Sequence, residues 1–263
     1  MSDPQEGPAF TASYRVRFDE SGPDGLVRSG SLLRYAQDIA WLHSEARGFD
    51  RRWYGERRLV WLVRAARLEV SARIPMGSLV EVATHVVGWR KVWARRLVRV
   101  ALGDATPAAR IVTDWVLVDA AGVPKRIPVA FEDAFSGVPL REPISRVELP
   151  AAPADTRAVT FRVRPQELDP NDHVNNAVYV DWLEEAIDRA GPDGAARPRG
   201  MGPTVTRALP RRYRLEYAAA ARGGQEITAA IWPDGRGWWC RMTAAGVGDV
   251  IRAHADVPES SRA

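Results

Sequence analysis

The segment Tyr14-Arg15-Val16-Arg17 has a counterpart in Phe161-Arg162-Val163-Arg164, which begins 147 residues later. The same offset aligns Arg67-Leu68-Glu69-Val70 with Arg214-Leu215-Glu216-Tyr217. A shared offset at two distant places indicates an internal duplication. We therefore expect the chain to contain two copies of one structural unit.

A helix is predicted in each copy, shortly after the first of these segments. Apolar residues recur at i, i+3, i+4, i+7 and i+8 from Leu32 to Ala40, and again from Tyr179 to Ile187. This spacing is typical of an amphipathic helix, and the 147-residue offset superimposes the two apolar stripes. Ser31 in the first copy, and Asn175 or Asn176 in the second, occupy the expected N-cap positions.

Strands are predicted after each helix, where apolar and polar residues alternate. They cover residues 59–70, 79–87, 93–102 and 110–119 in the first copy, and 211–217, 225–232, 238–244 and 249–255 in the second. Each copy is thus a short strand, a helix and several antiparallel strands. This order predicts an α+β fold in which one long helix packs on a curved antiparallel sheet.

The domain boundaries follow from a proline-rich stretch without periodicity, residues 136–158. We interpret this stretch as a linker between a first domain of residues 10–135 and a second domain of residues 159–258. Residues 1–9 are polar and are predicted to be a disordered N-terminus.

The two copies differ at the turn that precedes the helix. The first copy reads Gly22-Pro23-Asp24-Gly25-Leu26, which is an ordinary turn. The second reads Asp169-Pro170-Asn171-Asp172-His173 and continues into Val174-Asn175-Asn176. Polar and ionisable side chains are therefore concentrated in one copy only, which predicts a single functional site.

The chemistry of this segment suits acid–base catalysis. In an extended stretch, the alternating Asp169, Asn171 and His173 would point to one side. Histidine moves protons well near neutral pH, and the start of the following helix offers free N–H groups to an oxyanion. A structural, helix-capping histidine is the alternative interpretation of His173.

A metal site is not expected here. Asn171 is neutral, and a calcium loop counted from Asp169 would need Gly and Glu where Val174 and Val180 stand. No other cofactor is predicted. Glu216 lies in a strand in which apolar residues alternate with Arg214 and Glu216, so taken alone it reads as a surface glutamate.

These segments resemble the acyl-acyl carrier protein (acyl-ACP) thioesterases of plants and bacteria, which are tandem hot-dog proteins. Residues 168–176, with Tyr179 and Trp182, are similar to the family's catalytic loop and the helix after it. Tyr213-Arg214-Leu215-Glu216 is similar to the segment that ends in a catalytic Glu. The resemblance covers roughly residues 10–255 and implies two tandem hot-dog domains.

One departure concerns the mechanism. The family often has Cys after this Glu, and Tyr217 stands there. The resemblance then implies attack by water on a fatty acyl thioester, with Asp169, Asn171, His173 and Glu216 as the catalytic set. Glu216, with His173, would activate the water, and which of the two is the base stays open.

The implied substrate is a fatty acyl group on acyl carrier protein or coenzyme A. Asn175 and Asn176, at the start of the helix, would bind the thioester. The acyl pocket would come from the first domain, with Tyr35, Ile39 and Trp61 as candidates and ordinary core positions as the alternative. Arginine-rich stretches could meet an acidic carrier or the phosphate of phosphopantetheine, and a solvated strand face is the alternative interpretation of each; they are Arg90-Lys91 with Arg95-Arg96, and Arg207 with Arg211-Arg212.

Two other classes of function remain open. Hot-dog folds also serve hydratases and dehydratases of acyl thioesters, which release no thiol, and the Asn-rich loop argues against that class. A non-catalytic acyl-binding protein is the third interpretation. A nucleic-acid reader is disfavoured despite a pI of about 9.6, since no basic helix or aromatic-plus-basic sheet motif stands out.

The remaining expectations concern the cellular setting. Cys240 is the only cysteine, which rules out an intramolecular disulfide and fits a reducing, cytoplasmic location; we expect it to be a packing residue. No apolar run is long enough to span a membrane, and no signal-peptide core is seen at the N-terminus. A homodimer of the whole chain is compatible with these features.

Overall fold

The computed structural model describes residues 9–135, 137–190, 204–235 and 237–257. Most of the predicted N-terminal tail, residues 1–8, lies outside these ranges. Within them, no helix is long and apolar enough to cross a membrane.

The first half contains one long helix and a set of long antiparallel strands. In chain order its elements are β1 (Phe10–Arg15), α1 (Ser29–Ala46), α2 (Arg51–Arg57), β2 (Leu59–Val70), β3 (Leu79–Arg90), β4 (Trp93–Leu102), β5 (Pro107–Asp119), α3 (Val129–Ala134) and β6 (Val138–Pro139). A short 3-10 turn, Phe18–Glu20, lies between β1 and α1. The predicted strands are confirmed, and β3 and β5 extend three residues beyond the predicted bounds because the alternation continues across their ends.

The second half repeats this order. Its elements are β7 (Arg157–Arg162), α4 (Val178–Ala190), α5 (Thr204–Arg207), β8 (Arg211–Tyr217), β9 (Glu226–Asp234), β10 (Gly237–Ala244) and β11 (Gly248–Asp256). A 3-10 turn, Pro165–Glu167, again precedes the helix. Residues 140–156 contain no helix or strand; the domain boundaries drawn on either side of them stay a prediction.

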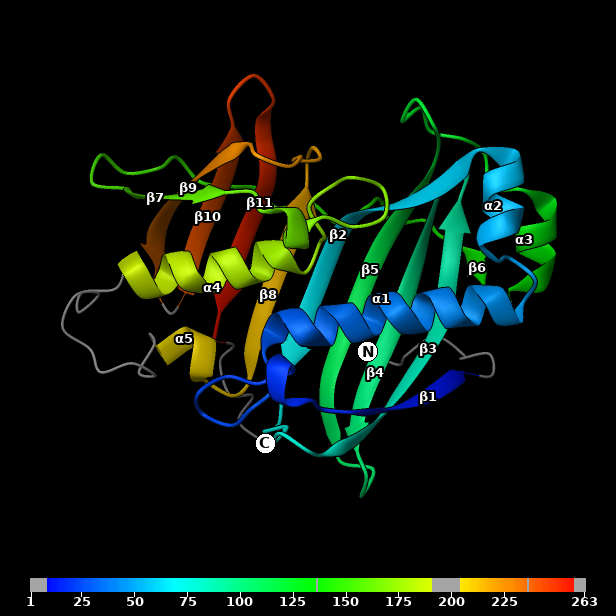
Figure 1. The fold of residues 1–263 in the computed structure, drawn as a ribbon, viewed down its shortest axis with the longest axis horizontal. Helices are drawn as coiled ribbons and strands as arrows, with labels where there is room; N and C mark the ends of the chain where they lie inside the picture. The colour runs from blue at the N-terminus through cyan, green and yellow to red at the C-terminus, as the bar shows by residue number, and fades with distance from the viewer. Residues whose placement is uncertain (1–8, 136, 191–203, 236, 258–263) are drawn as a thin grey trace.

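The described strands form one sheet with the order β1-β3-β4-β5-β2-β8-β11-β10-β9-β7, and β6 pairs with β3. From either edge to the middle, the order runs through equivalent strands of the two copies, and the two halves of the sheet meet at the antiparallel pair β2–β8. In that pair Arg67 lies opposite Arg214, its own repeat mate. The sheets of the two copies are therefore continuous, and α1 and α4 cover the same face of it (Figure 1).

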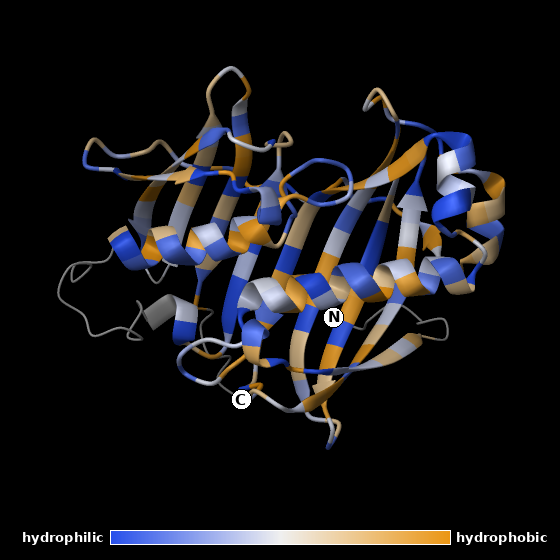
Figure 2. Ribbon diagram, viewed as in Figure 1, coloured by the Kyte–Doolittle hydropathy of each residue, from blue (hydrophilic) through white to orange (hydrophobic). Residues whose placement is uncertain are grey.

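The main core lies between these two helices and the sheet. Leu32, Ile39, Leu183 and Ile187 are fully buried there, as the helical spacing predicts. Hydrophobic and hydrophilic residues alternate in bands along both helices (Figure 2). A smaller apolar cluster lies on the opposite face, where Leu140 and Ile144 pack on Trp93, Val116 and Val118.

Two predicted helix caps need correction. Ser31 is not an N-cap, because α1 begins at Ser29 and the Ser31 hydroxyl instead donates to the carbonyl of Glu20, 3.1 Å away. Asn175 lies three residues before α4, where its Oδ1 accepts from the Ala177 N–H at 3.0 Å. Asn175 therefore orders the approach to α4 rather than its first turn.

Candidate active site

The segment from Asp169 to His173 folds as a tight turn. The Asp169 N–H donates to the His173 carbonyl at 2.7 Å, and Leu168 and Val174 form an isolated bridge. Asp172 has a φ of 59°, in the left-handed region that closes such turns. The expectation of an extended stretch with three side chains on one side is therefore wrong.

The first copy builds the same turn from different residues. The Gly22 N–H donates to the Leu26 carbonyl at 2.8 Å, and Gly25, the repeat mate of Asp172, has a φ of 71°. Both copies therefore share one backbone design, and they differ in the side chains that this design carries.

Asp169 fastens its turn with one carboxylate oxygen. Oδ1 accepts from the Asn171 N–H at 2.8 Å and from the His173 N–H at 3.3 Å. The other oxygen, Oδ2, has no recorded partner in the described part of the chain. One oxygen thus holds the turn while the other stays available to a ligand or a water molecule.

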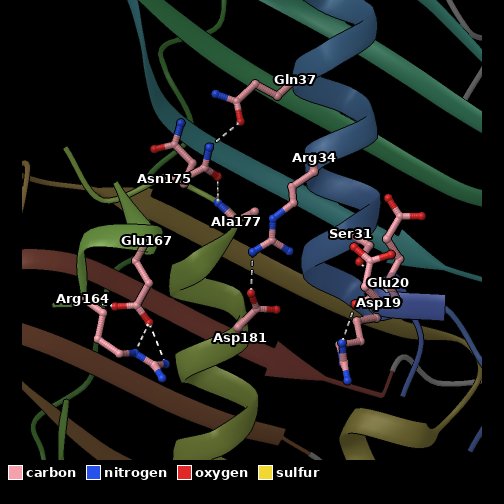
Figure 3. A network of polar contacts seen from close by, with 12 residues as sticks. Asp19, Glu20, Ser31, Arg34, Gln37, Arg164, Glu167, Asn175, Ala177 and Asp181 are labelled. Atoms are coloured by element: carbon pink, nitrogen blue, oxygen red, sulfur yellow. Dashed lines mark hydrogen bonds and ion pairs between the residues drawn. The ribbon is translucent and has the colours of Figure 1, made fainter. Parts of the chain in front are cut away.

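Asn175 joins this turn to the helix of the other half. Its Nδ2 donates to Oε1 of Gln37 on α1 at 3.1 Å (Figure 3). The Val174 N–H donates to the Ala221 carbonyl at 2.9 Å, and the Tyr217 hydroxyl donates to the Asn176 carbonyl at 3.1 Å. The approach to α4 is therefore held from three sides.

A cleft of about 830 Å³ opens beside this turn, between α1, α2 and the sheet of the first half. Five aromatic residues of the first half line it: Trp41, Tyr54, Trp61, Trp115 and Phe131. At the junction with the second half it is lined by Arg34, Gln37, Asp38, Asp169, Asn171 and Asn175. The cleft thus combines aromatic walls with polar groups where the second copy meets it, and Ser44, Glu45 and Arg96 add polar groups in the first half. Apolar walls with a few polar groups are usual for a small-molecule site.

Four of the predicted site residues line this cleft: Trp61, Asp169, Asn171 and Asn175. Tyr35 and Ile39 do not. Tyr35 is buried and its hydroxyl donates to Glu20 at 2.5 Å, and Ile39 is wholly buried in the core. Their helix face packs on the sheet, which makes them the ordinary core residues of the alternative interpretation. His173 and Asn176 are half-buried and are not among the lining residues.

Glu216 lies in β8, and its side chain is on the face of the sheet away from the helices. Its neighbours Leu215 and Tyr217 belong to the core under the helices, so its own side chain points to the opposite face. There Oε2 accepts from the Val147 N–H at 2.9 Å, and Oε1 lies 3.9 Å from Arg252 Nη1. Glu216 therefore points away from the cleft that Asp169 lines, because a one-residue step along a strand reverses the face. The expectation that Glu216, with His173, activates a water stays a prediction.

The paired arginines are also placed differently from the expectation. Arg95, Arg96 and Arg211 are buried and cannot meet a carrier at the surface. Two adjacent arginines in a strand must face opposite sides of the sheet, so one of them had to point toward the helices. That signal was present in the sequence, and it identifies Arg96 as a lining residue that the sequence analysis missed. Gln37 was missed too, because its role depends on the contact with Asn175.

The equivalent place in the other half is filled by side chains. The repeat mate of Gln37 is Glu184, whose Oε1 accepts from the Tyr213 hydroxyl at 2.5 Å. The same hydroxyl lies 3.3 Å from Ser29 Oγ, and Tyr213 occupies the place of Ala66 in the first copy. Burial raises the pKa of Glu184. This network of side chains fills the second-half counterpart of the place that Gln37 occupies beside the cleft.

Comparison with known proteins agrees with this architecture. Residues 7–133 match the sequence model of the acyl-ACP thioesterase N-terminal domain, and residues 151–191 match that of the C-terminal domain. The chain belongs to the acyl-ACP thioesterase family, and its fold is a pair of tandem hot-dog domains, as predicted.

Individual relatives are distant. The acyl-(acyl-carrier-protein) hydrolase FATB2 of Cuphea viscosissima is 26% identical over 201 residues, covering 69% of this chain and 48% of that protein. The chain thus spans about half the length of the curated relatives it matches. A structure described as an oleoyl thioesterase from Lactobacillus plantarum has a TM-score of 0.80 at 19% identity, covering 96% of this chain and 98% of that one. The 12:0-ACP thioesterase from Umbellularia californica has a TM-score of 0.74 at 21% identity, covering 97% and 98%.

Proposed function

We propose that this protein hydrolyses a fatty acyl thioester, carried by acyl carrier protein or coenzyme A, to a free fatty acid and the carrier thiol. The observation that carries the proposal is the composite cleft. Its aromatic walls come from the first copy, and the turn with a free carboxylate oxygen comes from the second. Membership of the acyl-ACP thioesterase family supports the same reaction.

In this proposal Asp169 is the general base. Its Oδ2 takes a proton from a water molecule, whose oxygen attacks the thioester carbonyl carbon. The tetrahedral intermediate then collapses, the carbon–sulfur bond breaks, and the departing sulfur receives the proton from Asp169. The amides of Asn171 and Asn175 orient the thioester at this end of the cleft.

The oxyanion needs a donor near the start of α4. The N–H groups of Val174, Asn175, Ala177 and Val178 all have acceptors. Among the described residues, the N–H groups of Asn176 and Tyr179 have no acceptor, which makes these two groups, just beyond the residues that line the cleft, the candidate donors to the oxyanion. This role fits the predicted part of Asn176 in substrate binding; a direct catalytic role of His173 stays a prediction, beside the part of its backbone in closing the turn.

One chain supplies both the cleft and the turn, so a homodimer is not needed to complete the site. The homodimer and the cytoplasmic location therefore stay predictions. The choice between acyl carrier protein and coenzyme A is left to experiment, because the lining residues of the cleft bind the acyl group in either case.

Release of thiol from a panel of acyl-ACP and acyl-CoA substrates tests the proposal. We expect Asp169→Asn to lower kcat by at least about a hundred-fold, the usual worth of a general base. Asp172→Asn is the matched control, since Asp172 is exposed, its ion pair with Arg222 lies at the surface, and Asn tolerates its positive φ. The control should stay within about two-fold of wild type.

Either of two results would overturn the proposed reaction, and a third would overturn the role of Asp169. Absence of thiol release from every substrate, with the acyl chain still bound, would favour an acyl-binding protein. Formation of hydroxyacyl from enoyl thioesters without thiol release would favour a hydratase. Equal losses in Asp169→Asn and Asp172→Asn would assign the effect to the turn and not to the carboxylate.

A further inference from the structure

The end of the cleft remote from Asp169 is polar. The cleft runs along α1, and Asn175 contacts Gln37 at the end of the cleft beside the Asp169 turn. Ser44 lines it two turns further along the helix, about 10 Å away. Ser44 is buried there beside Tyr54, whose hydroxyl accepts from Trp61 Nε1 at 3.0 Å. An alkyl chain that filled the cleft would thus end against polar groups.

Arg96 contributes a positive charge to the same end. It is buried, lines the cleft, and its Nη1 lies 2.9 Å from Nδ1 of His43 and 3.3 Å from Oγ1 of Thr84. Among the described residues no carboxylate is paired with it. Its guanidinium lies 6.0 Å from the ring of Phe135, a weak cation–π contact.

The adjacent Arg95 is a buried arginine whose positive charge is paired with carboxylates. On the opposite face of the sheet, its Nε lies 2.7 Å from Asp114 Oδ1 and its Nη1 lies 2.9 Å from Glu142 Oε2. Arg95 therefore has two carboxylate partners, one of them buried, where Arg96 has none within the described ranges. The protein can thus place carboxylates against a buried arginine at the position next to Arg96 in the same strand.

The neighbours of Arg96 do not neutralise it. Burial, assisted by the charge of Arg96, lowers the pKa of His43 to about 3, so His43 is neutral and accepts a hydrogen bond at Nδ1. Burial also lowers the pKa of Arg96 to about 10, which leaves it protonated at neutral pH. A buried charge without a counter-ion is costly, and a ligand that brought an anion would remove that cost.

We propose that Arg96 binds a carboxylate at the far end of the acyl chain, so that the preferred substrates are thioesters of dicarboxylic acids with one free carboxylate. The guanidinium can receive a carboxylate in a two-pronged hydrogen bond, and the hydroxyls of Ser44 and Tyr54 lie at the same end of the cleft. This inference rests on the proposed hydrolysis, because it names the acyl group that the same site would accept.

The test compares two substrates of equal chain length on one carrier, the decanoyl thioester and the half-thioester of decanedioic acid. We expect wild type to prefer the carboxylated substrate by at least about ten-fold in kcat/KM, the worth of one hydrogen bond to a charged group. Arg96→Met should remove this preference, with the larger loss of kcat/KM on the carboxylated substrate, and Arg96→Lys should restore part of it.

Arg110→Met is the matched control, because Arg110 is an exposed arginine of the neighbouring strand β5 and lies outside the cleft. It should leave the preference unchanged. A wild type that prefers decanoyl, or an Arg96→Met variant with the wild-type ratio, would overturn the inference. The wild-type ratio is decisive even if Arg96→Met does not fold.

Failure of the hydrolysis itself would be recognised separately. If neither substrate releases thiol, calorimetric titration with the monomethyl ester of decanedioic acid, which keeps one free carboxylate, and with methyl decanoate, which has none, still decides the role of Arg96. Tighter binding of the monomethyl ester to wild type, lost in Arg96→Met, would support the carboxylate site in a protein that is not a hydrolase. Equal binding of both esters would overturn it.

Discussion

Arg34 and Asp181 form an ion pair, with 2.7 Å between Nη2 and Oδ2, and they are separated in sequence by the 147 residues of the internal repeat. They are the same position in the two copies, and they face each other where α1 meets α4 (Figure 3). Arg67 and Arg214, a second equivalent pair, lie opposite each other in the sheet. The two domains therefore meet about an approximate twofold axis that crosses both layers.

The close approach of the helices at this axis requires Gly30. A Cβ atom there would lie 2.2 Å from Oδ1 of Asp181 and 3.1 Å from Nη1 of Arg34. We expect Gly30→Ala to lower the free energy of unfolding, because the clash costs about 1–3 kcal/mol and helix propensity returns at most about 1 kcal/mol. Gly55→Ala in α2 is the control, since nothing lies within 4 Å of that Cβ. Urea denaturation of both variants checks this, and equal stabilisation of the two would contradict it.

Glu216 is expected to position the site from behind the sheet. The neighbouring Arg64, whose charge it supports, donates to the carbonyls of Tyr217 and Ala218, in the segment that leads to Ala221 and the Asp169 turn. Glu216→Gln should lower the free energy of unfolding by about 1–3 kcal/mol, because it weakens buried hydrogen bonds to a charged group. The fold-loss of kcat in Glu216→Gln should be at least about ten times smaller than the fold-loss in Asp169→Asn.

Thermal unfolding and thiol release, measured on the same preparations, separate these effects. A Glu216→Gln variant with wild-type stability and a loss of kcat equal to that of Asp169→Asn would contradict this assignment. It would restore Glu216 to a direct catalytic role.

His43 is expected to make the fold sensitive to acid. Burial lowers the pKa of His43 to about 3 in the folded protein, below the ordinary histidine value of 6.5, so the unfolded chain binds an extra proton between these values. Stability should therefore fall as the pH is lowered from about 6.5 to 3, by at most about 1.4 kcal/mol per pH unit from this one group. His43→Asn keeps an acceptor for Arg96 and does not titrate.

The measurement is the free energy of unfolding of wild type and His43→Asn from pH 8 to pH 4. The difference between the two should be constant above about pH 7 and should shift in favour of the variant below it. Parallel curves across the whole range would show that His43 is not protected from protonation.

Ala94 is expected to limit the length of the acyl chain. It is buried, lines the cleft and carries the smallest side chain that β4 presents there. Ala94→Leu should lower kcat/KM for the longest accepted substrate by at least about ten-fold, and leave short chains little changed, since each lost methylene contact in a pocket is worth about 1–3 kcal/mol. Ala121→Leu, in the exposed turn after β5, is the matched control. A uniform loss across chain lengths would indicate general damage to the site.

Much of the fold could be predicted because its signals are local or periodic. The repeat offset located both helices, and alternation located the strands, since each depends on residues close in sequence. The alternation around Glu216 also contained the information that its side chain opposes Tyr217. The extended conformation predicted for residues 169–173 is wrong because both copies close this turn through a residue in the left-handed region, Gly25 or Asp172. Only Gly indicates that conformation clearly in a sequence.

The sequence by itself determined that the chain is a duplicated α+β unit and that one copy carries the polar turn, because periodicity and repeat spacing are written along the chain. Only the tertiary structure decided that the cleft lies in the first copy while its polar end comes from the second. Only the tertiary structure shows that Arg95 has two carboxylate partners and that Arg96 has none among the described residues. The physical reason is that burial and charge pairing depend on what covers each face of the sheet, and that cover comes from segments far away in sequence.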